Sequence, residues 1–76
     1  MLKLDGMGGY VVPGTACADE EMDPDAGVYK VWADIKDCDG YPGQVIGWRI
    51  ASSPNRNIAE LIAEAINKSA SELTAL

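Results

Sequence analysis

The sequence predicts a small α+β domain, an antiparallel sheet of two or three strands with one C-terminal helix packed across one face. Residues 28–51 alternate apolar and polar side chains on both sides of an Asp39-Gly40 pair, which is the pattern of a β-hairpin. Residues 57–75 instead place apolar side chains at the spacing of one helix face. With 76 residues, the chain (1–76) is expected to form a single domain with one small core.

Residues 1–13 are a candidate first strand, in which apolar ends flank a run of glycines. The segment Gly6-Met7-Gly8-Gly9 is partly similar to a nucleotide-binding loop. The third glycine of that motif would fall at Val11, however, and Pro13-Gly14 excludes the helix that has to follow it. We therefore expect a bulged or bent edge strand here, and whether it joins the sheet is left open.

Residues 14–27 have the composition of a loop, with Pro24 and Gly27 as breakers. Its five carboxylates are Asp19, Glu20, Glu21, Asp23 and Asp25. Three interpretations are open: a mobile, solvated loop, an acidic patch that binds a protein partner, or a metal site. The acids do not have the spacing of an EF-hand loop, so no metal ligand is assigned.

The β-hairpin is the stretch around which the other elements are organised. Its predicted strands are Val28–Lys36 and Gln44–Ala51, joined near Asp39-Gly40 by a turn that we expect to be type I′. One face of the first strand is wholly apolar, with Tyr29, Val31, Ala33 and Ile35. Folding the chain about the turn pairs Ile35 with Gln44, Ala33 with Ile46, Val31 with Trp48 and Tyr29 with Ile50.

This register also makes predictions for the other face of the hairpin. Trp32 lies opposite Gly47, where a large ring is able to cover a strand glycine. Lys30 lies opposite Arg49, and this like-charge pair argues either against the register or for an acidic neighbour beside it.

The helix has two candidate starts, Asn57 as an N-cap with Glu60 three residues later, and Ser53-Pro54. Its apolar stripe consists of Ile58, Leu61, Ile62, Ala65, Ile66, Ser69, Leu73 and Leu76. We expect five of these to be buried against the hairpin, at roughly 1.5–3 kcal/mol each. They are Ile58, Leu61, Ile62, Ile66 and Leu73.

The net charge of the chain and its two cysteines limit the classes of function and the compartment that we expect. The formal net charge of −6 disfavours direct binding to nucleic acid or to an anionic membrane and favours a partner with a basic surface. Met1–Val12 lacks the apolar core of a secretion signal, and no segment approaches a membrane span of ~20 apolar residues. We therefore expect a cytoplasmic protein in which Cys17 and Cys38 are free thiols, with a bridge between them as the less favoured alternative.

The chemistry of the side chains argues against an enzyme. Histidine is absent from the sequence, which removes the commonest general base and the commonest zinc ligand. The two cysteines cannot close a structural zinc site by themselves, and neither has a basic neighbour that would activate it. No cofactor, metal or catalytic residue is assigned.

The sequence offers one candidate partner-binding patch besides the acidic loop. Trp32, Tyr41 and Arg49 belong to the residue types that are enriched at interface hot spots. Trp32 could be covered in three ways, which remain open: by the N-terminal segment, by a second subunit, or by a foreign partner.

The stretch Asn57-Ile58-Ala59-Glu60-Leu61-Ile62-Ala63-Glu64-Ala65-Ile66, with Leu73 and Leu76, resembles the closing helix of many small phage and prophage proteins. In those proteins, too, a short β-hairpin commonly precedes the helix. Ile58 stands where they usually have alanine, and the customary proline before the last leucines is missing. The resemblance implies a small phage-type accessory protein. Acidic phage proteins of this size include inhibitors of bacterial defence complexes, which form the anti-CRISPR class. It carries over no catalytic residue.

Together these observations predict a non-enzymatic, acidic protein-binding module, most concretely a phage-type inhibitor that occludes a basic nucleic-acid-binding surface of a CRISPR effector complex in a bacterial host. The five loop carboxylates would meet that surface while Trp32 or Tyr41 anchors. The alternatives are a self-associating accessory protein that uses its open sheet face as a homodimer interface, and a small-ligand or metal binder.

Overall fold

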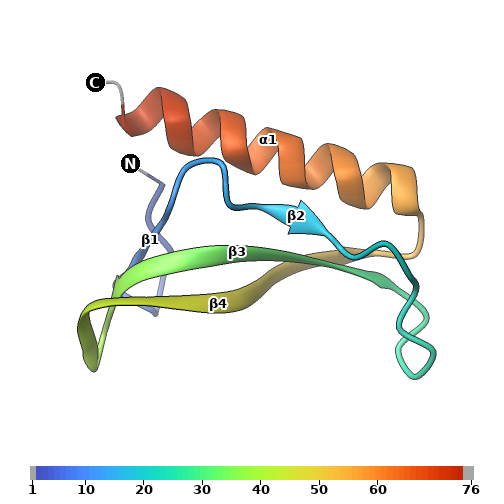
Figure 1. The fold of residues 1–76 in the computed structure, drawn as a ribbon, viewed down its shortest axis with the longest axis horizontal. Helices are drawn as coiled ribbons and strands as arrows, with labels where there is room; N and C mark the ends of the chain where they lie inside the picture. Colours follow the sequence, from blue (N-terminus) through green and yellow to red (C-terminus); the bar gives the residue numbers. More distant parts are fainter. Residues whose placement is uncertain (1, 75–76) are drawn as a thin grey trace.

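The computed structural model describes residues 2–74, and the side chains of residues 2–71, as one antiparallel sheet with a helix across one face (Figure 1). Its elements are β1 (Tyr10–Val11), β2 (Cys17–Ala18), β3 (Tyr29–Cys38), β4 (Tyr41–Ser53) and α1 (Arg56–Thr74). The α+β class is as the sequence predicts. The sheet has four strands rather than two or three, because β1 and β2 are too short to show an alternating pattern.

β3 is the central strand of the sheet. β4 pairs along one of its edges, and β1 and β2 follow one another along the other edge, all of them antiparallel. The candidate first strand therefore joins the sheet, through β1, and it is bent as expected: Leu4 N–H donates to Gly9 O and Val11 N–H donates to Leu2 O. β2 lies inside the segment 14–27, for which the composition had predicted a loop.

The predicted hairpin is present, but its register is shifted by two residues. Ile35 pairs with Ile46 instead of Gln44, and Ala33 pairs with Trp48. A bulge causes the shift, because residues 42–44 of β4 face only Asp37, which has a φ of 59° and accepts a hydrogen bond from Gly43 N–H at 2.7 Å. Gly40 has a φ of 85° whereas Asp39 is not in the positive-φ region, so the turn is not type I′.

A second bulge, at Ile50, changes the pairing toward the other end of the hairpin. Trp32 pairs with Arg49, not Gly47, and Val31 pairs with Ala51 instead of Trp48. Beyond the bulge Tyr29 pairs with Ser53 instead of Ile50, and Lys30 lies opposite Ser52. The predicted pair of Lys30 with Arg49 therefore does not form, because the predicted register is wrong here. Lys30 Nζ instead lies 2.7 Å from Asp23 Oδ2.

Both candidate helix starts are wrong, because Asn55 is the N-cap. Its Oδ1 accepts a hydrogen bond from Ile58 N–H at 3.1 Å, which satisfies a backbone donor of the first turn. Glu60, expected to close a capping box with Asn57, instead pairs with Arg56 at 3.2 Å.

The core joins one face of β3 to a narrow, small-residue face of α1. Val31, Ala33 and Ile35 are buried beneath three alanines of the helix, which are Ala59, Ala63 and Ala70. Ile62 and Ile66 are partly buried at its margin, in line with the prediction.

The predicted stripe is wrong for four of its described members, because Ile58, Leu61, Ala65 and Ser69 are all exposed. Ile58 is 50% exposed and Leu61 is 61% exposed. The rotation of α1 is fixed by Asn67, whose side-chain amide both accepts from Ala16 N–H and donates to Ala16 O, each at 2.9 Å. The side chain of Leu73, and residues 75 and 76, lie outside the described part of the chain.

Candidate binding surfaces

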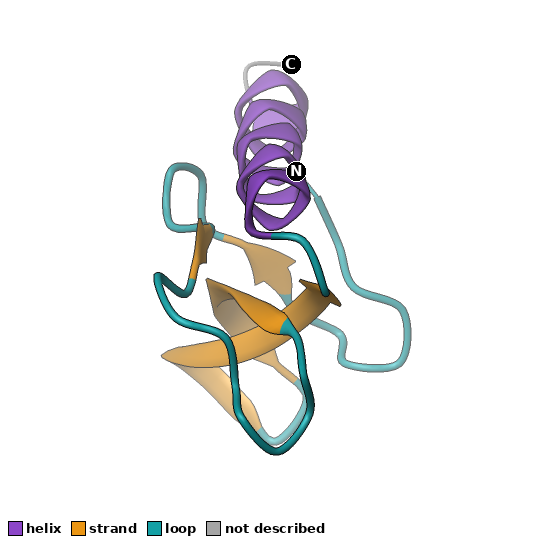
Figure 2. Cartoon of the chain, turned by 90° about the vertical axis from the view of Figure 1, so that its right-hand side faces the viewer, coloured by secondary structure: helices purple, strands orange, loops and turns teal. Residues whose placement is uncertain are grey.

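The acidic loop forms a hydrogen-bonded arm that spans residues 19–28, which we call the acidic arm. Asp19 N–H donates to Lys30 O and Asp23 N–H donates to Val28 O, both at 2.9 Å, so its two sides are held together by the backbone. The arm projects from the sheet on the side away from α1, beside the start of β3 (Figures 1 and 2).

The five carboxylates of the arm have different roles. Asp23 Oδ1 accepts hydrogen bonds from Asp25 N–H and Ala26 N–H, while Oδ2 pairs with Lys30. The hydrogen bond from the Lys30 ammonium, helped by that from Asp25 N–H, lowers the pKa of the Asp23 carboxyl below its usual value. Asp23 therefore shapes the arm.

Glu20, Glu21 and Asp25 are exposed, and Asp19 is half-buried. None of these four forms an ion pair within the described part of the chain, so they give the arm its free negative charge.

Trp32 and Arg49 lie side by side on the face of the sheet that α1 leaves open, which we call the open face. They are direct partners across β3 and β4, and Trp32 is 37% exposed. Tyr10, Lys36 and Val45 form a second row on this face, and Lys3 pairs with Tyr10 at its end. Lys3, Lys36 and Arg49 make no ion pair with any described residue. Asp34 lies on the same face, opposite Gly47, so these side chains leave the open face with a small net positive charge in a chain of net charge −6.

Tyr41 is not part of this patch. It pairs with Cys38 at the far end of the hairpin, and Cys38 points into the core, so Tyr41 lies on the helix side of the sheet. The predicted partner-binding residues therefore fall into three separate places: the acidic arm, the open face and the hairpin turn.

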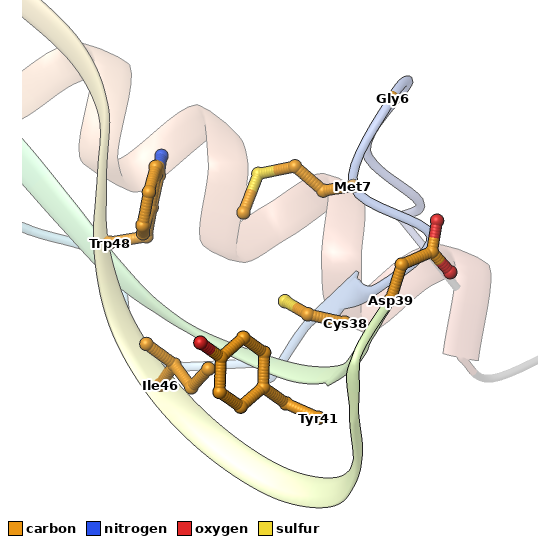
Figure 3. Close-up of a pocket in the computed structure, with 7 residues that line it drawn as sticks. All are labelled: Gly6, Met7, Cys38, Asp39, Tyr41, Ile46 and Trp48. Carbon is orange, nitrogen blue, oxygen red and sulfur yellow. The ribbon is translucent and has the colours of Figure 1, made fainter.

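The hairpin turn holds a pocket that the sequence did not reveal, which we call the turn pocket. It has a volume of about 230 Å³ and is lined by Gly6, Met7, Cys38, Asp39, Tyr41, Ile46 and Trp48 (Figure 3). The predicted register placed Trp48 on the buried face opposite Val31, but Trp48 is half-exposed at the edge of the sheet. The sequence signal for the turn pocket was weak and consisted of a glycine-rich segment and a predicted hairpin turn.

The outer edge of β4 has no strand partner among residues 2–74. Five of the exposed large apolar side chains belong to β4 or to α1: Tyr41, Val45, Trp48, Ile58 and Leu61. The thiols of Cys17, exposed on the open face, and Cys38, buried, are both free, so no bridge joins them.

Two kinds of feature are absent from the described residues. These residues contain no group of three or more acidic or cysteine side chains placed to hold a metal ion. α1 lacks the apolar length of a helix that crosses a membrane, and no other described segment forms such a helix. None of the family models, curated proteins and solved structures with which the chain was compared matches it.

Proposed function

We propose that the protein is a non-enzymatic binding module whose acidic arm docks on a basic, nucleic-acid-binding surface of another protein. The observation that carries this proposal is the arm itself, where Glu20, Glu21 and Asp25 are exposed and form no ion pair with another described residue. Because backbone hydrogen bonds already hold the arm in shape, little conformational entropy is lost when it binds. The net charge of −6 adds long-range attraction to such a partner.

The partner we propose is a CRISPR effector complex, in the cytoplasm of a bacterial host. The resemblance of the C-terminal helix to those of small phage proteins supports this choice, and the two free thiols are in keeping with a reducing compartment. The arm would occupy lysines and arginines that otherwise hold nucleic acid, so inhibition would be steric and electrostatic.

The test removes the charge of the arm without changing its shape. Glu20→Gln, Glu21→Gln and Asp25→Asn together should abolish binding to purified effector complexes that wild type binds in competition with nucleic acid. Asp23 is left unchanged because it shapes the arm. The matched control, Asp5→Asn with Glu60→Gln and Glu64→Gln, changes the net charge equally at exposed sites elsewhere and should bind as wild type does.

Two results would overturn the proposal. If the arm variant still binds and inhibits, the arm is not the contact surface. If no effector complex is bound by wild type, the proposed partner is wrong.

A second candidate function, self-association through the open face, is favoured by the distribution of charge along β3. The acidic arm lies at the Tyr29 end of the strand, whereas Lys36 and Lys3 lie near the Cys38 end of the same face. A twofold axis through this face would bring the arm of each copy to the lysines of the other, with Trp32 between the sheets.

This candidate predicts a dimer that depends on salt. By light scattering, it should be a dimer at about 0.01 M salt and a monomer at about 1 M, where the Debye length falls from ~30 Å to ~3 Å. Lys36→Glu should give a monomer at both salt concentrations, whereas Lys68→Glu, on an exposed part of α1, should behave as wild type. A monomer at low salt and micromolar concentration rules out this function.

A further inference from the structure

The outer edge of β4 presents backbone groups that are free to pair with another strand. Val12 N–H donates to Asp34 O at 2.9 Å and Asp34 N–H donates to Thr15 Oγ1 at 3.0 Å, so both backbone groups of Asp34 point away from β4. Gly47 is the partner of Asp34 across β3 and β4. The two therefore form a non-hydrogen-bonded pair, in which the N–H and C=O of Gly47 point to the outer edge. By alternation, the same holds for the residues two positions to either side of Gly47.

This edge is regular over residues 45–49. The two bulges of the hairpin lie on either side of this stretch, which keeps one unbroken register with β3 and has Gly47 at its centre. Arg49 is its single charged residue, it contains no proline, and the side chains of Val45 and Trp48 are half-exposed. An edge strand of this kind lacks the charges and prolines that usually keep a further strand from pairing with it.

The stretch is complementary to itself. In an antiparallel pairing with a second copy about a twofold axis at Gly47, Gly47 faces itself and Val45 faces Arg49, and each such pair exchanges two backbone hydrogen bonds. Ile46 then lies opposite the second copy's Trp48, as an aromatic–β-branched pair of the type that stabilises sheets.

Charge and strand geometry favour this axis over its neighbours. An axis at Arg49 would place two guanidinium groups directly opposite each other, which is destabilising. An axis at Val45 would require pairing by residues 42–44, where β4 is bulged. With the axis at Gly47, neither cost arises.

The turn pocket adjoins this edge, since Ile46 and Trp48 belong to its lining. Its volume of about 230 Å³ is below that of a typical drug-sized ligand site, about 300–1,000 Å³. Its one charged lining residue, Asp39, turns its carboxylate away from Trp48 (Figure 3), so the hollow suits an apolar cover. The pairing about Gly47 supplies one, because the second copy's Trp48 stands opposite Ile46 at the border of the pocket.

We propose that a second copy of this chain pairs antiparallel with β4 along residues 45–49, about a twofold axis at Gly47, so that the two sheets become one continuous sheet. A foreign strand could use the same backbone groups, but it would have to bring its own large apolar side chain to the position opposite Ile46. The second copy brings Trp48 there by symmetry. The proposal goes beyond the proposed function, because it uses neither the acidic arm nor the open face.

The first test is the response of the oligomeric state to salt. Light scattering at micromolar concentration should show a dimer at about 1 M salt, with a dimer fraction no lower than at about 0.01 M. Both copies carry a net charge of −6, so screening does not weaken an association that rests on backbone hydrogen bonds and apolar contact. A monomer at about 1 M salt would overturn the proposal.

The two tryptophans provide a matched pair of variants, because they lie on opposite faces of the sheet. Trp48→Glu should weaken association by about tenfold or more, whereas Trp32→Glu, on the open face, should dimerise as wild type does. A dimer that survives Trp48→Glu, or one that is lost in Trp32→Glu, would show that the β4 edge is not the interface.

Disulfide crosslinking tests the axis itself, in a Cys17→Ser background that removes the exposed thiol. Gly47→Cys fits the sheet, since the nearest atom to a Cβ there is 3.9 Å away. It places two thiols on residues whose Cα atoms are about 5.5 Å apart, within reach of a disulfide, so oxidation should link the two chains. In Arg49→Cys the thiols are offset by about 13 Å along the strands and should not link. Absence of the link in Gly47→Cys, or equal linking in both variants, would overturn the proposed pairing.

Discussion

Replacing Ile35 by alanine should remove a large part of the stability of this domain. Ile35 lies at the centre of β3, is 0% exposed and packs against β1 and the alanine face of α1. Buried Ile→Ala substitutions cost about 2–5 kcal/mol. A 76-residue chain has only roughly 4–11 kcal/mol of stability in total. Urea unfolding followed by circular dichroism should show a midpoint well below that of wild type, with an unchanged slope.

Leu61→Ala is the matched control, because it also truncates a large aliphatic side chain. Leu61 belongs to the apolar stripe that the sequence predicts to be buried, but it is 61% exposed. We therefore expect a change within about 0.5 kcal/mol, as for surface substitutions in general. If Leu61→Ala destabilises as much as Ile35→Ala, then the face of α1 that packs on the sheet is not the alanine face.

The contrast between these two residues shows which features a single sequence determines. The buried face of β3 follows from alternation within one strand, so Val31, Ala33 and Ile35 could be assigned to the core correctly. The rotation of α1 does not follow from its own pattern. It depends on contacts between distant segments, above all the two hydrogen bonds between Asn67 and Ala16.

The register of the hairpin was missed for a similar reason. The pairing of Cys38 with Tyr41 next to the turn follows from the Asp39-Gly40 signal. The two-residue shift beyond it requires Asp37 to adopt a positive φ, which is uncommon outside glycine and has no reliable sequence signal. Because the shift is even, the two faces of the sheet were still assigned correctly there.

The candidate sites also differ in how far the sequence alone could locate them. The acidic arm is a run of neighbouring residues, so composition alone located it. The turn pocket combines residues 6–7, 38–41 and 46–48, which meet only because of the observed register and the loop over the turn. The positive charge of the open face was hidden because net charge averages over a surface on which positive and negative residues are separated.

The second large effect is expected at Gly9, whose lack of a side chain lets β1 approach β3. A Cβ at this position would lie 2.7 Å from Ile35 Cγ2 and 2.8 Å from Lys36 O. Lys36 O belongs to the backbone of the central strand, so it cannot yield without disturbing the pairing of β1 with β3. Gly9→Ala should therefore destabilise the domain by about 1–3 kcal/mol, measured by urea unfolding.

Gly47→Ala separates this packing effect from the general cost of replacing a strand glycine. Gly47 also lies in the sheet, but its nearest neighbour to a new Cβ is Asp34 Oδ1 at 3.9 Å, so alanine fits without strain. We expect no loss of stability there, or a small gain because alanine restricts the unfolded chain. Equal effects at the two glycines would show that β1 does not pack tightly on β3.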